Sequence, residues 1–377
     1  MRDCQEGKGL KNKNCVKITF TGDIMCTKQE IPAHKTKTGE YDFSEMFKDC
    51  KSYFSSSDYV VGNLETPLAD AYYCNNPINY NSPAAFAQAI KNIGFSMVTT
   101  ANNHCLDRGV AGVEDTLNVL DSIGLKHTGT NSKNILPTGI IEDINNIKIG
   151  FLSYTYGTNA WFNKNYLKND EKWKINLYQE QELHRNRKKN SFMFFERMRK
   201  DIKLLKNTGA EYIIMCLHAG GQYSRVPQKN TKKITALIAE MGVDAVITNH
   251  EHVIHNIEFL SDKIITYSLG NFSSLFCIYS GPFIKLSDYS IIFNLYLSKN
   301  NNIVKTADIS FSIAKTVKTG KNRVKTALLF DLIKNCANTK ARAKLLRDNL
   351  KIYNRFLNRK ETEIEPKLEY QIKRKIT

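Results

Sequence analysis

Three of the eight histidines in this 377-residue chain lie within six positions of one another, at His250, His252 and His255. The segment before them, VDAVIT at residues 243–248, is rich in β-branched residues and predicts a short buried strand. In an extended chain, residues i and i+2 point to one face, so His250 and His252 could converge while His255 falls on the other phase. Two histidines on a surface loop would also explain the pair. Because imidazole is the commonest metal ligand in proteins, the segment equally raises the question of a metal site.

Candidate ligands elsewhere in the chain also follow predicted strands. Strand patterns occupy residues 16–23, 57–65, 95–100, 148–155 and 210–218, with further ones at 262–272, 288–298 and 303–313. Helical patterns lie between them at residues 82–94, 111–124, 192–207 and 231–242. Residues 160–200 carry little strand pattern and are interpreted as an insertion leading into a helix. This alternation of strands and helices predicts an α/β fold.

Polar side chains stand at the ends of five of these strands: Asp23, Glu65, Asn103 with His104, His218, and His250 with His252. Each residue alone would be an ordinary turn or capping residue. In α/β sheets, however, ligands bind in the crevice outside the carboxyl ends of the strands. Five strands that bring oxygen and nitrogen ligands to one edge predict a metal site.

The ligand types indicate which ions the site would hold. Carboxylate, amide and imidazole groups suit one or two divalent ions such as Mn²⁺, Fe²⁺ or Zn²⁺. The nine cysteines form no C-x-x-C pair, which argues against a closed structural zinc site. We expect them to be reduced and mostly buried rather than part of a disulfide framework.

The net charge of +17 is concentrated at the C-terminal end, where residues 318–377 contain 17 Lys or Arg and 6 Asp or Glu. Apolar residues recur there at helical spacing, so this region is predicted to form a basic amphipathic helix. Its apolar residues are Leu345, Leu346, Leu350, Tyr353 and Phe356. The helix could pack on the main domain with a solvated basic face, or it could bind an anionic polymer or associate peripherally with an acidic membrane surface. No nucleic-acid partner is expected, and the sequence leaves the oligomeric state open.

No run of 18 apolar residues occurs, and residues 1–20 lack the apolar segment of a signal peptide. These features predict a cytoplasmic protein.

Six short segments provide a more specific indication, namely FTGDIM, VGNLETPL, ANNHCLDRG, LHAGGQY, NHEHV and YSLGNF, in this order. Together they resemble the bacterial CapA family of capsule and poly-γ-glutamate synthesis proteins, which is similar in fold to calcineurin-like metallophosphoesterases. The resemblance covers residues 16–275 and implies a two-sheet β-sandwich flanked by helices. We therefore expect an N-terminal extension at 1–15, a metallophosphoesterase-like domain at 16–317 and a basic helical extension at 318–377.

The resemblance also implies a role for each site residue. Those matching the metal ligands are Asp23, Glu65, Asn103, His218, His250 and His252. His104 would lie beside the metals, where its imidazole could act as general acid toward the leaving group. Arg108 could orient an anionic substrate or pair with Asp107. Met25 stands where the phosphoesterase signature Asp-x-His has its histidine, so one full-strength and one weak metal position are expected.

Two functions remain open at this stage. The first is a metal-dependent hydrolase that cleaves a phosphoester or a γ-glutamyl amide bond in capsule or poly-γ-glutamate biosynthesis. The second is a non-catalytic, metal-containing component of polymer synthesis or export that binds an anionic polymer. His104 favours the first, because a site that only binds needs no general acid.

Overall fold

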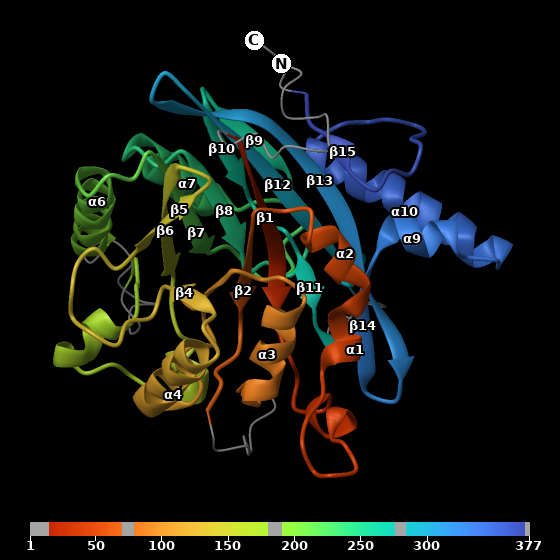
Figure 1. Cartoon of the computed structure of the whole chain (residues 1–377), viewed down its shortest axis with the longest axis horizontal. Coiled ribbons are helices and arrows are strands. Elements are labelled where there is room, and N and C mark those ends of the chain that lie inside the picture. Colours follow the sequence, from red (N-terminus) through yellow and green to blue (C-terminus); the bar gives the residue numbers. More distant parts are fainter. Residues whose placement is uncertain (1–14, 70–78, 180–190, 276–283, 374–377) are drawn as a thin grey trace.

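The computed structural model describes residues 15–69, 79–179, 191–275 and 284–373. Two β-sheets pack face to face, and helices cover their outer faces (Figure 1). This arrangement confirms the predicted α/β class with two sheets flanked by helices.

The larger sheet has the strand order β14-β13-β12-β1-β2-β3-β4, with β11 beside β1 and β15 beside β13. Its strands are β1 (Cys15–Ile24), β2 (Tyr59–Leu64), β3 (Met97–Thr99), β4 (Lys126–Thr128), β11 (Asn271–Ser273), β12 (Tyr289–Asn300), β13 (Ile303–Gly320), β14 (Arg323–Leu328) and β15 (Tyr370–Gln371). The smaller sheet has the order β5-β6-β7-β8-β10-β9. Its strands are β5 (Ile140–Ile144), β6 (Ile147–Thr155), β7 (Tyr212–His218), β8 (Ala245–Asn249), β9 (Ile257–Leu260) and β10 (Lys263–Thr266).

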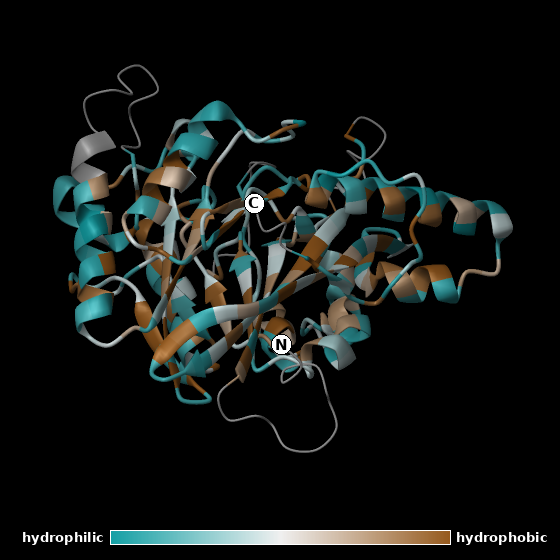
Figure 2. Cartoon of the chain, turned by 90° about the horizontal axis from the view of Figure 1, so that it is seen from above, coloured by the Kyte–Doolittle hydropathy of each residue, from teal (hydrophilic) through white to brown (hydrophobic). Residues whose placement is uncertain are grey.

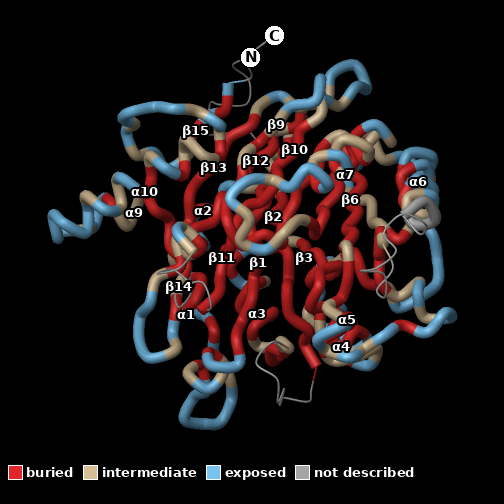
Figure 3. Tube along the Cα trace, turned by 180° about the vertical axis from the view of Figure 1, so that it is seen from behind, coloured by how far each residue is buried: buried red, intermediate tan, exposed pale blue. Residues whose placement is uncertain are grey.

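Alternating side chains explain how the sheets bury both faces. On β12, Ile291, Phe293 and Leu295 belong to the core between the sheets, whereas Ile292 belongs to the core beneath the outer helices. That outer core is covered by α1 (Ser44–Phe47), α2 (Lys51–Phe54) and α3 (Ala84–Asn92). Next along the chain, α4 (Gly109–Ser122) lies beside β4 at the edge of the larger sheet (Figure 1), and α5 (Ala160–Asn163) follows β6. The outer face of the smaller sheet packs against α6 (Ser191–Asn207) and α7 (Lys229–Glu240). In Figure 3 the strands are accordingly buried, and exposed residues are concentrated in loops and on the outer sides of helices.

The parallel strands position the candidate ligands. β1, β2, β3 and β4 run parallel in the larger sheet, and β6, β7, β8 and β10 run parallel in the smaller one. The carboxyl ends of each set therefore meet at one edge of its sheet. The candidate ligands lie at or just after the ends of strands, as predicted. These strands belong to two facing sheets rather than to a single one.

The strand predicted at 262–272, with its end turned by Gly270 and Asn271, is two strands in the structure, because the chain leaves the smaller sheet after β10 and enters the larger one as β11. The backbone passes very close to β1 where it crosses from one sheet to the other. Gly270 has φ +79°, and a Cβ on Gly22 would lie 2.1 Å from the Gly270 carbonyl oxygen. This close approach lets the Asp23 amide donate a hydrogen bond to Gly270 at 2.9 Å and aligns Asp23 with Asn271. The switch between sheets thus helps to build the site.

Residues beyond 317 are integrated into the main body. The predicted boundary lies inside β13, and the region continues through β14, α9 (Leu329–Lys334) and α10 (Thr339–Leu357) before β15 pairs with β13. Ile352 and Phe356 are fully buried in the core between the sheets, with the Phe356 ring 4.9 Å from that of Phe311. Figure 2 shows hydrophobic and hydrophilic residues alternating along α10, as its amphipathic pattern predicted. Removing residues 318–377 would therefore cut the larger sheet and expose part of the core.

Two further expectations concern cysteines and membranes. Cys15 is disulfide-bonded, so the expectation of reduced thiols is wrong for this residue. The free cysteines of the described chain are Cys26, Cys50, Cys105, Cys216 and Cys336. Within the described residues, every helix is too short or too polar to cross a bilayer.

A buried carboxylate in the loop after β1 gives the fold a pH dependence. Glu30 is fully buried and accepts hydrogen bonds from the amides of Thr27 at 2.7 Å and Leu275 at 3.3 Å. Burial raises its pKa to about 7. The folded chain therefore holds this proton at pH values where the unfolded chain has lost it, and stability falls as pH rises from about 4.5 to about 7.

We expect Glu30→Gln to flatten this dependence. Between pH 5 and pH 8, wild type should lose roughly 2–3 kcal/mol of unfolding free energy through this group, and the variant should not. Urea unfolding at the two pH values measures the difference, with the exposed Glu45→Gln as control. An unchanged slope in Glu30→Gln would refute the assignment.

Candidate metal centre

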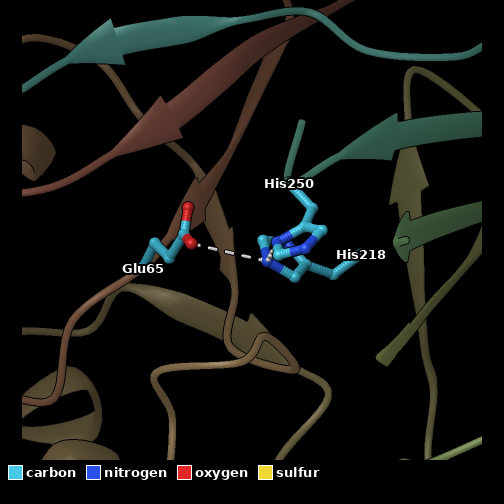
Figure 4. A group of neighbouring side chains, drawn as sticks. All are labelled: Glu65, His218 and His250. Carbon is cyan, nitrogen blue, oxygen red and sulfur yellow. Dashed lines mark hydrogen bonds and ion pairs between the residues drawn. The ribbon is translucent and has the colours of Figure 1, made fainter. Parts of the chain in front are cut away.

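The six predicted ligands converge between the two sheets. Asp23 and Glu65 come from β1 and the end of β2, and Asn103 from the loop after β3. The three histidines come from the smaller sheet, at the end of β7 and after β8. Figure 4 shows Glu65, His218 and His250 pointing toward one another.

Two groups of potential ligands share one carboxylate. Glu65, His218 and His250 form one group, and Asp23, Glu65 and His252 form the other. In each group one ligand atom per residue lies within 4.8 Å of the others, and all of the side chains are buried. Glu65 thus stands where two ions could meet.

Glu65 also provides the test of whether these residues fit a metal. It is completely buried, and neither of its carboxylate oxygens has a hydrogen-bond partner within the described chain. The imidazole Nε2 atoms of His218 and His252 lie 3.5 Å and 3.8 Å from its Oε1 atom. A buried carboxylate without hydrogen bonds is costly unless a cation neutralises it. The donor set therefore fits one or two divalent ions.

Two asparagines complete the inner surface. The Asn103 Oδ1 atom lies 2.6 Å from His218 Nε2, which in turn lies 3.1 Å from His250 Nδ1. Asn63 donates to Asp23 Oδ1 at 2.8 Å, and its Nδ2 lies 3.3 Å from His218 Nδ1. The sequence prediction included Asn103 but not Asn63, although both lie at strand ends. Asn63 acts by orienting the two side chains that it contacts.

His250 and His252 converge by a route that the sequence did not predict. Neither is extended, since β8 ends at Asn249 and their φ angles are +111° and +56°. The bend is held by Asn271, whose Oδ1 lies 2.9 Å from His252 Nδ1 and whose amide donates to the His252 carbonyl at 3.1 Å. The predicted pair is brought together, but the alternation of an extended strand is not the reason.

The third histidine of the segment has a different environment. His255 pairs with the buried Glu251 carboxylate, and its Nε2 atom lies 2.8 Å from the Ser224 carbonyl oxygen. Glu251 also accepts a hydrogen bond from the Gly221 amide at 3.2 Å. At Gly220, φ is +116° and a Cβ would lie 2.0 Å from Glu251 Oε1. These contacts hold the loop after β7 against residues 250–255.

The electrostatics differ between the two ligand groups. Burial opposes a charge on His252, but the carboxylates of Glu65 and Asp23 raise its pKa to about 9. Despite burial, the contact with His252 and the charge of His218 lower the pKa of Asp23. Burial and the neighbouring histidines lower the pKa of His250 well below its usual value, so its ring is neutral, as a ligand must be.

The predicted acid His104 lies at the edge of this cluster. It is buried, and its Nδ1 atom lies 2.7 Å from Asp107 Oδ2. Asp107 is itself fixed, because it accepts hydrogen bonds from the Tyr80 amide at 2.7 Å and from Asn163 at 3.1 Å. Arg108 is half-buried at the N-cap of α4. Its two suggested roles, orienting an anionic substrate and pairing with Asp107, stay predictions.

Three tyrosines form the walls of the site. Ring centroids of Tyr80 and His104 are 4.3 Å apart, those of Tyr156 and His250 are 4.7 Å apart, and those of Tyr223 and His252 are 5.6 Å apart. Burial and the charge of Glu65 raise the pKa of both Tyr80 and Tyr156, so these phenols are neutral. The sequence analysis did not include them: Tyr80 and Tyr223 lie in loops, and Tyr156, which directly follows β6, has no metal-ligand atom of the kind sought at strand ends.

These contacts predict different effects for two neighbouring histidines. We expect His250→Ala to weaken metal binding by at least about tenfold, because it removes a ligand. His255→Ala should leave the bound metal unchanged and lower the melting temperature, because it breaks the contact with Glu251. Metal titration and thermal unfolding of both variants separate the outcomes. Equal losses of metal in both would contradict the arrangement described here.

Comparison with known proteins identifies the family. The model of the bacterial capsule synthesis protein family PGA_cap matches residues 17–275. The "Capsule biosynthesis protein CapA" of Bacillus anthracis is 24% identical over 275 residues, which cover 70% of this chain and 61% of the relative. The "PGA biosynthesis protein CapA" of Bacillus subtilis (strain 168) is 24% identical over 267 residues, which cover 67% and 62%. The chain therefore spans a little over three fifths of the length of these relatives.

Solved structures with a similar arrangement are more distant. The calcineurin-like phosphoesterase YfkN from Bacillus subtilis is 13% identical, with a TM-score of 0.44, over 80% of this chain and 91% of that one. A 5'-nucleotidase from Candida albicans is 10% identical, with a TM-score of 0.40, over 89% and 58%. The family match extends over the strands and loops that carry all of the candidate ligands. The chain belongs to the PGA_cap family of bacterial capsule synthesis proteins.

Proposed function

We propose that this protein is a metal-dependent hydrolase that cleaves a phosphoester or a γ-glutamyl amide bond during synthesis of a capsular polymer or poly-γ-glutamate. The observation that carries this proposal is the position of the His104–Asp107 pair beside two ligand groups joined by Glu65. A site that only bound an anion would need the cations but not a histidine oriented by a carboxylate. The names of the two CapA relatives, a capsule biosynthesis protein and a PGA biosynthesis protein, support the choice of polymer.

We assign separate roles to the residues of the site: binding the ions, transferring a proton and excluding water. One group of side chains would hold the ions: Asp23, Glu65, Asn103, His218, His250 and His252. Bound divalent ions would supply Lewis acidity and lower the pKa of a coordinated water. Asp107 accepts a hydrogen bond from His104 Nδ1, which fixes the ring and leaves Nε2 as the nitrogen that can pass a proton to the leaving group. Tyr80, Tyr156 and Tyr223 limit the access of water to the reacting bond.

The Asp23 group has fewer ligands than the phosphoesterase pattern would give it. Met25 is buried and has no ligand atom suited to a hard or borderline ion. One position is therefore proposed to bind more tightly than the other. The identity of the metal is open among Mn²⁺, Fe²⁺ and Zn²⁺.

The test is a measurement of metal content on the full chain, followed by a screen of metal-loaded and chelator-treated protein. The substrates are aryl and alkyl phosphoesters and γ-glutamyl oligopeptides. We expect one class to be hydrolysed, and only by the metal-loaded form. Bound metal without hydrolysis of either class would favour the non-catalytic alternative, in which the site binds a polymer end. A chain that binds no metal would overturn both.

A further inference from the structure

The segment after β6 connects the smaller sheet to the loop that carries His104 and Asp107, referred to below as the acid pair. Tyr156 directly follows β6 and packs on His250, with ring centroids 4.7 Å apart. Further along the same segment, the Asn163 Nδ2 atom donates a hydrogen bond to Asp107 Oδ1 at 3.1 Å. Because Asp107 belongs to the loop after β3 in the larger sheet, this contact joins the two sheets next to the metal centre.

A single helical turn between two left-handed residues directs Asn163 inward. Asn159 and Lys164 border α5, with φ angles of +52° and +61°. Such an angle is unfavourable for lysine, so contacts elsewhere must hold the turn in this shape. The side chains of Trp161 and Phe162 are exposed, whereas Asn163 is half-buried. Of these three neighbours, Asn163 is therefore the one that the turn presents to the protein interior.

Both polar atoms of the Asn163 side chain have partners. Nδ2 donates to the Thr158 carbonyl at 2.6 Å as well as to Asp107, and Oδ1 accepts from the Asn165 amide at 2.9 Å. Reversal of the amide would turn its oxygen toward two acceptors, so these bonds fix its orientation. Asn165 in turn donates from its Nδ2 atom to the Leu106 carbonyl at 2.9 Å. The turn is thus bonded to both the side chain and the backbone of the loop after β3.

An apolar cluster holds the rest of the segment against the same loop. Leu106 of that loop belongs to one buried cluster with Leu117 of α4. The same cluster includes Leu167 and Ile175, which follow α5. The first part of the insertion predicted at 160–200 therefore packs against the loop of the acid pair rather than standing apart from the main domain.

The hydrogen bond from Asn163 completes the environment of a buried carboxylate. Asp107 Oδ2 already accepts from His104 Nδ1 at 2.7 Å and from the Tyr80 amide at 2.7 Å. Asn163 donates to the other oxygen, so the carboxylate is held at both ends. Loss of this donor would leave a buried carboxylate oxygen unsatisfied, and rotation to find another partner would carry Oδ2 away from the imidazole. The orientation of the His104 ring therefore depends on Asn163.

We propose that Asn163 is a positioning residue for the acid pair, which acts through Asp107 to hold the His104 ring in the orientation that serves proton transfer from Nε2. This inference rests on the proposed function in one respect, the role of His104 as general acid. It also gives the inserted segment a function. The segment ties the acid pair, which the larger sheet carries, to the smaller sheet, which supplies the three histidine ligands.

The test uses two substitutions of Asn163 and one control. Asn163→Asp keeps the shape of the side chain but replaces the donor with an oxygen that repels Asp107. Asn163→Ala removes the donor without adding charge. The matched control is Asn131→Asp, because the half-buried Asn131 also donates within the inserted segment, to the Trp173 carbonyl at 2.9 Å and to Asn176 Oδ1 at 3.0 Å. All three variants should retain the metal content of wild type.

The first readout is the kcat of the metal-loaded full chain. With an alkyl ester or an amide, Asn163→Asp should lower kcat about tenfold, as for loss of a hydrogen bond to a charged group, with little change in KM. Asn163→Ala should cause a smaller loss. With a nitrophenyl ester, whose leaving group departs without a proton, both variants should stay within about twofold of wild type. The control should stay within about twofold on every substrate.

The same assay contains the outcomes that oppose the proposal. Equal slowing of all substrates in Asn163→Asp would show a general disturbance of the site and overturn the positioning role. An unchanged kcat with the alkyl ester and the amide would overturn it as well. Adding Asn163→Asp to His104→Gln should cause no further loss, because both changes act on one proton transfer.

A second readout needs no activity: the NMR resonance of the His104 ring N–H proton, recorded without metal or with Zn²⁺. An N–H group bonded to a buried carboxylate exchanges slowly with water, so wild type should show this resonance and His104→Gln should lack it. Asn163→Asp should weaken or abolish it, and Asn131→Asp should retain it. An unchanged resonance in both Asn163 variants would overturn the proposal. Its selective loss in a protein that hydrolyses none of the substrates would retain Asn163 as the positioning residue and refute only the proposed reaction.

Discussion

Glutamine in place of Glu65 should weaken metal binding at both ligand groups and make the metal-free protein less stable. The two effects have one origin, because Glu65 belongs to both groups of potential ligands and its buried carboxylate also stabilises the charged form of His252. Loss of residues that merely support a ligand costs about 10–100-fold in metal affinity, so loss of a shared ligand should cost at least about 100-fold. Removing this carboxylate leaves protonated His252 with Asp23 as its carboxylate partner, so the melting temperature in the presence of chelator should fall.

The measurement is metal content and thermal unfolding of Glu65→Gln with and without added Mn²⁺ or Zn²⁺. Wild type should gain stability on metal addition, and the variant should not. The exposed Glu45→Gln is the control for a change of carboxylate to amide. A variant that retains stoichiometric metal would show that Glu65 is not a ligand. A variant more stable than wild type without metal would show that the cost of burying the carboxylate exceeds its interaction with His252.

The sequence was sufficient to predict which strands end at the site, because that information is local. Asp23, Glu65 and His218 each follow a run of apolar residues, and the run itself makes the strand. The division of the strands between two sheets required the family resemblance, since strand patterns do not specify which strands pair. The same limit applies at 262–272, where one apolar pattern serves β10 in one sheet and β11 in the other.

The residues that the sequence did not indicate act through contacts between distant segments. Asn63 reaches His218 across 155 positions, and the side chain of Tyr156 packs on His250. Neither has a local pattern that distinguishes it from an ordinary polar or aromatic residue. The C-terminal region shows the same limit in another form. The amphipathic helix α10 was predictable from its sequence. Its packing against Phe311 was not, because that contact joins the helix to a residue of β13.

A substitution of His104 should separate catalysis from metal binding. We expect His104→Gln to lower kcat by about 10²–10⁴-fold, the usual contribution of a general acid, with metal content unchanged. Asp107→Asn should cause a smaller loss of kcat, because the ring keeps a hydrogen-bond partner but no longer a charged one. His127→Gln is the matched control, because His127 also pairs with an aspartate, Asp121 at 3.0 Å, but at the surface.

The leaving group provides the decisive comparison for His104. A substrate whose leaving group departs without a proton, such as a nitrophenyl ester, should lose much less activity in His104→Gln than an alkyl ester or an amide. A ligand role would instead lower metal content and slow all of these substrates alike. Equal losses with intact metal content would mean that His104 orients the substrate rather than protonating it. Only the selective loss fits a histidine whose Nδ1 is held by a buried carboxylate and whose Nε2 remains for proton transfer.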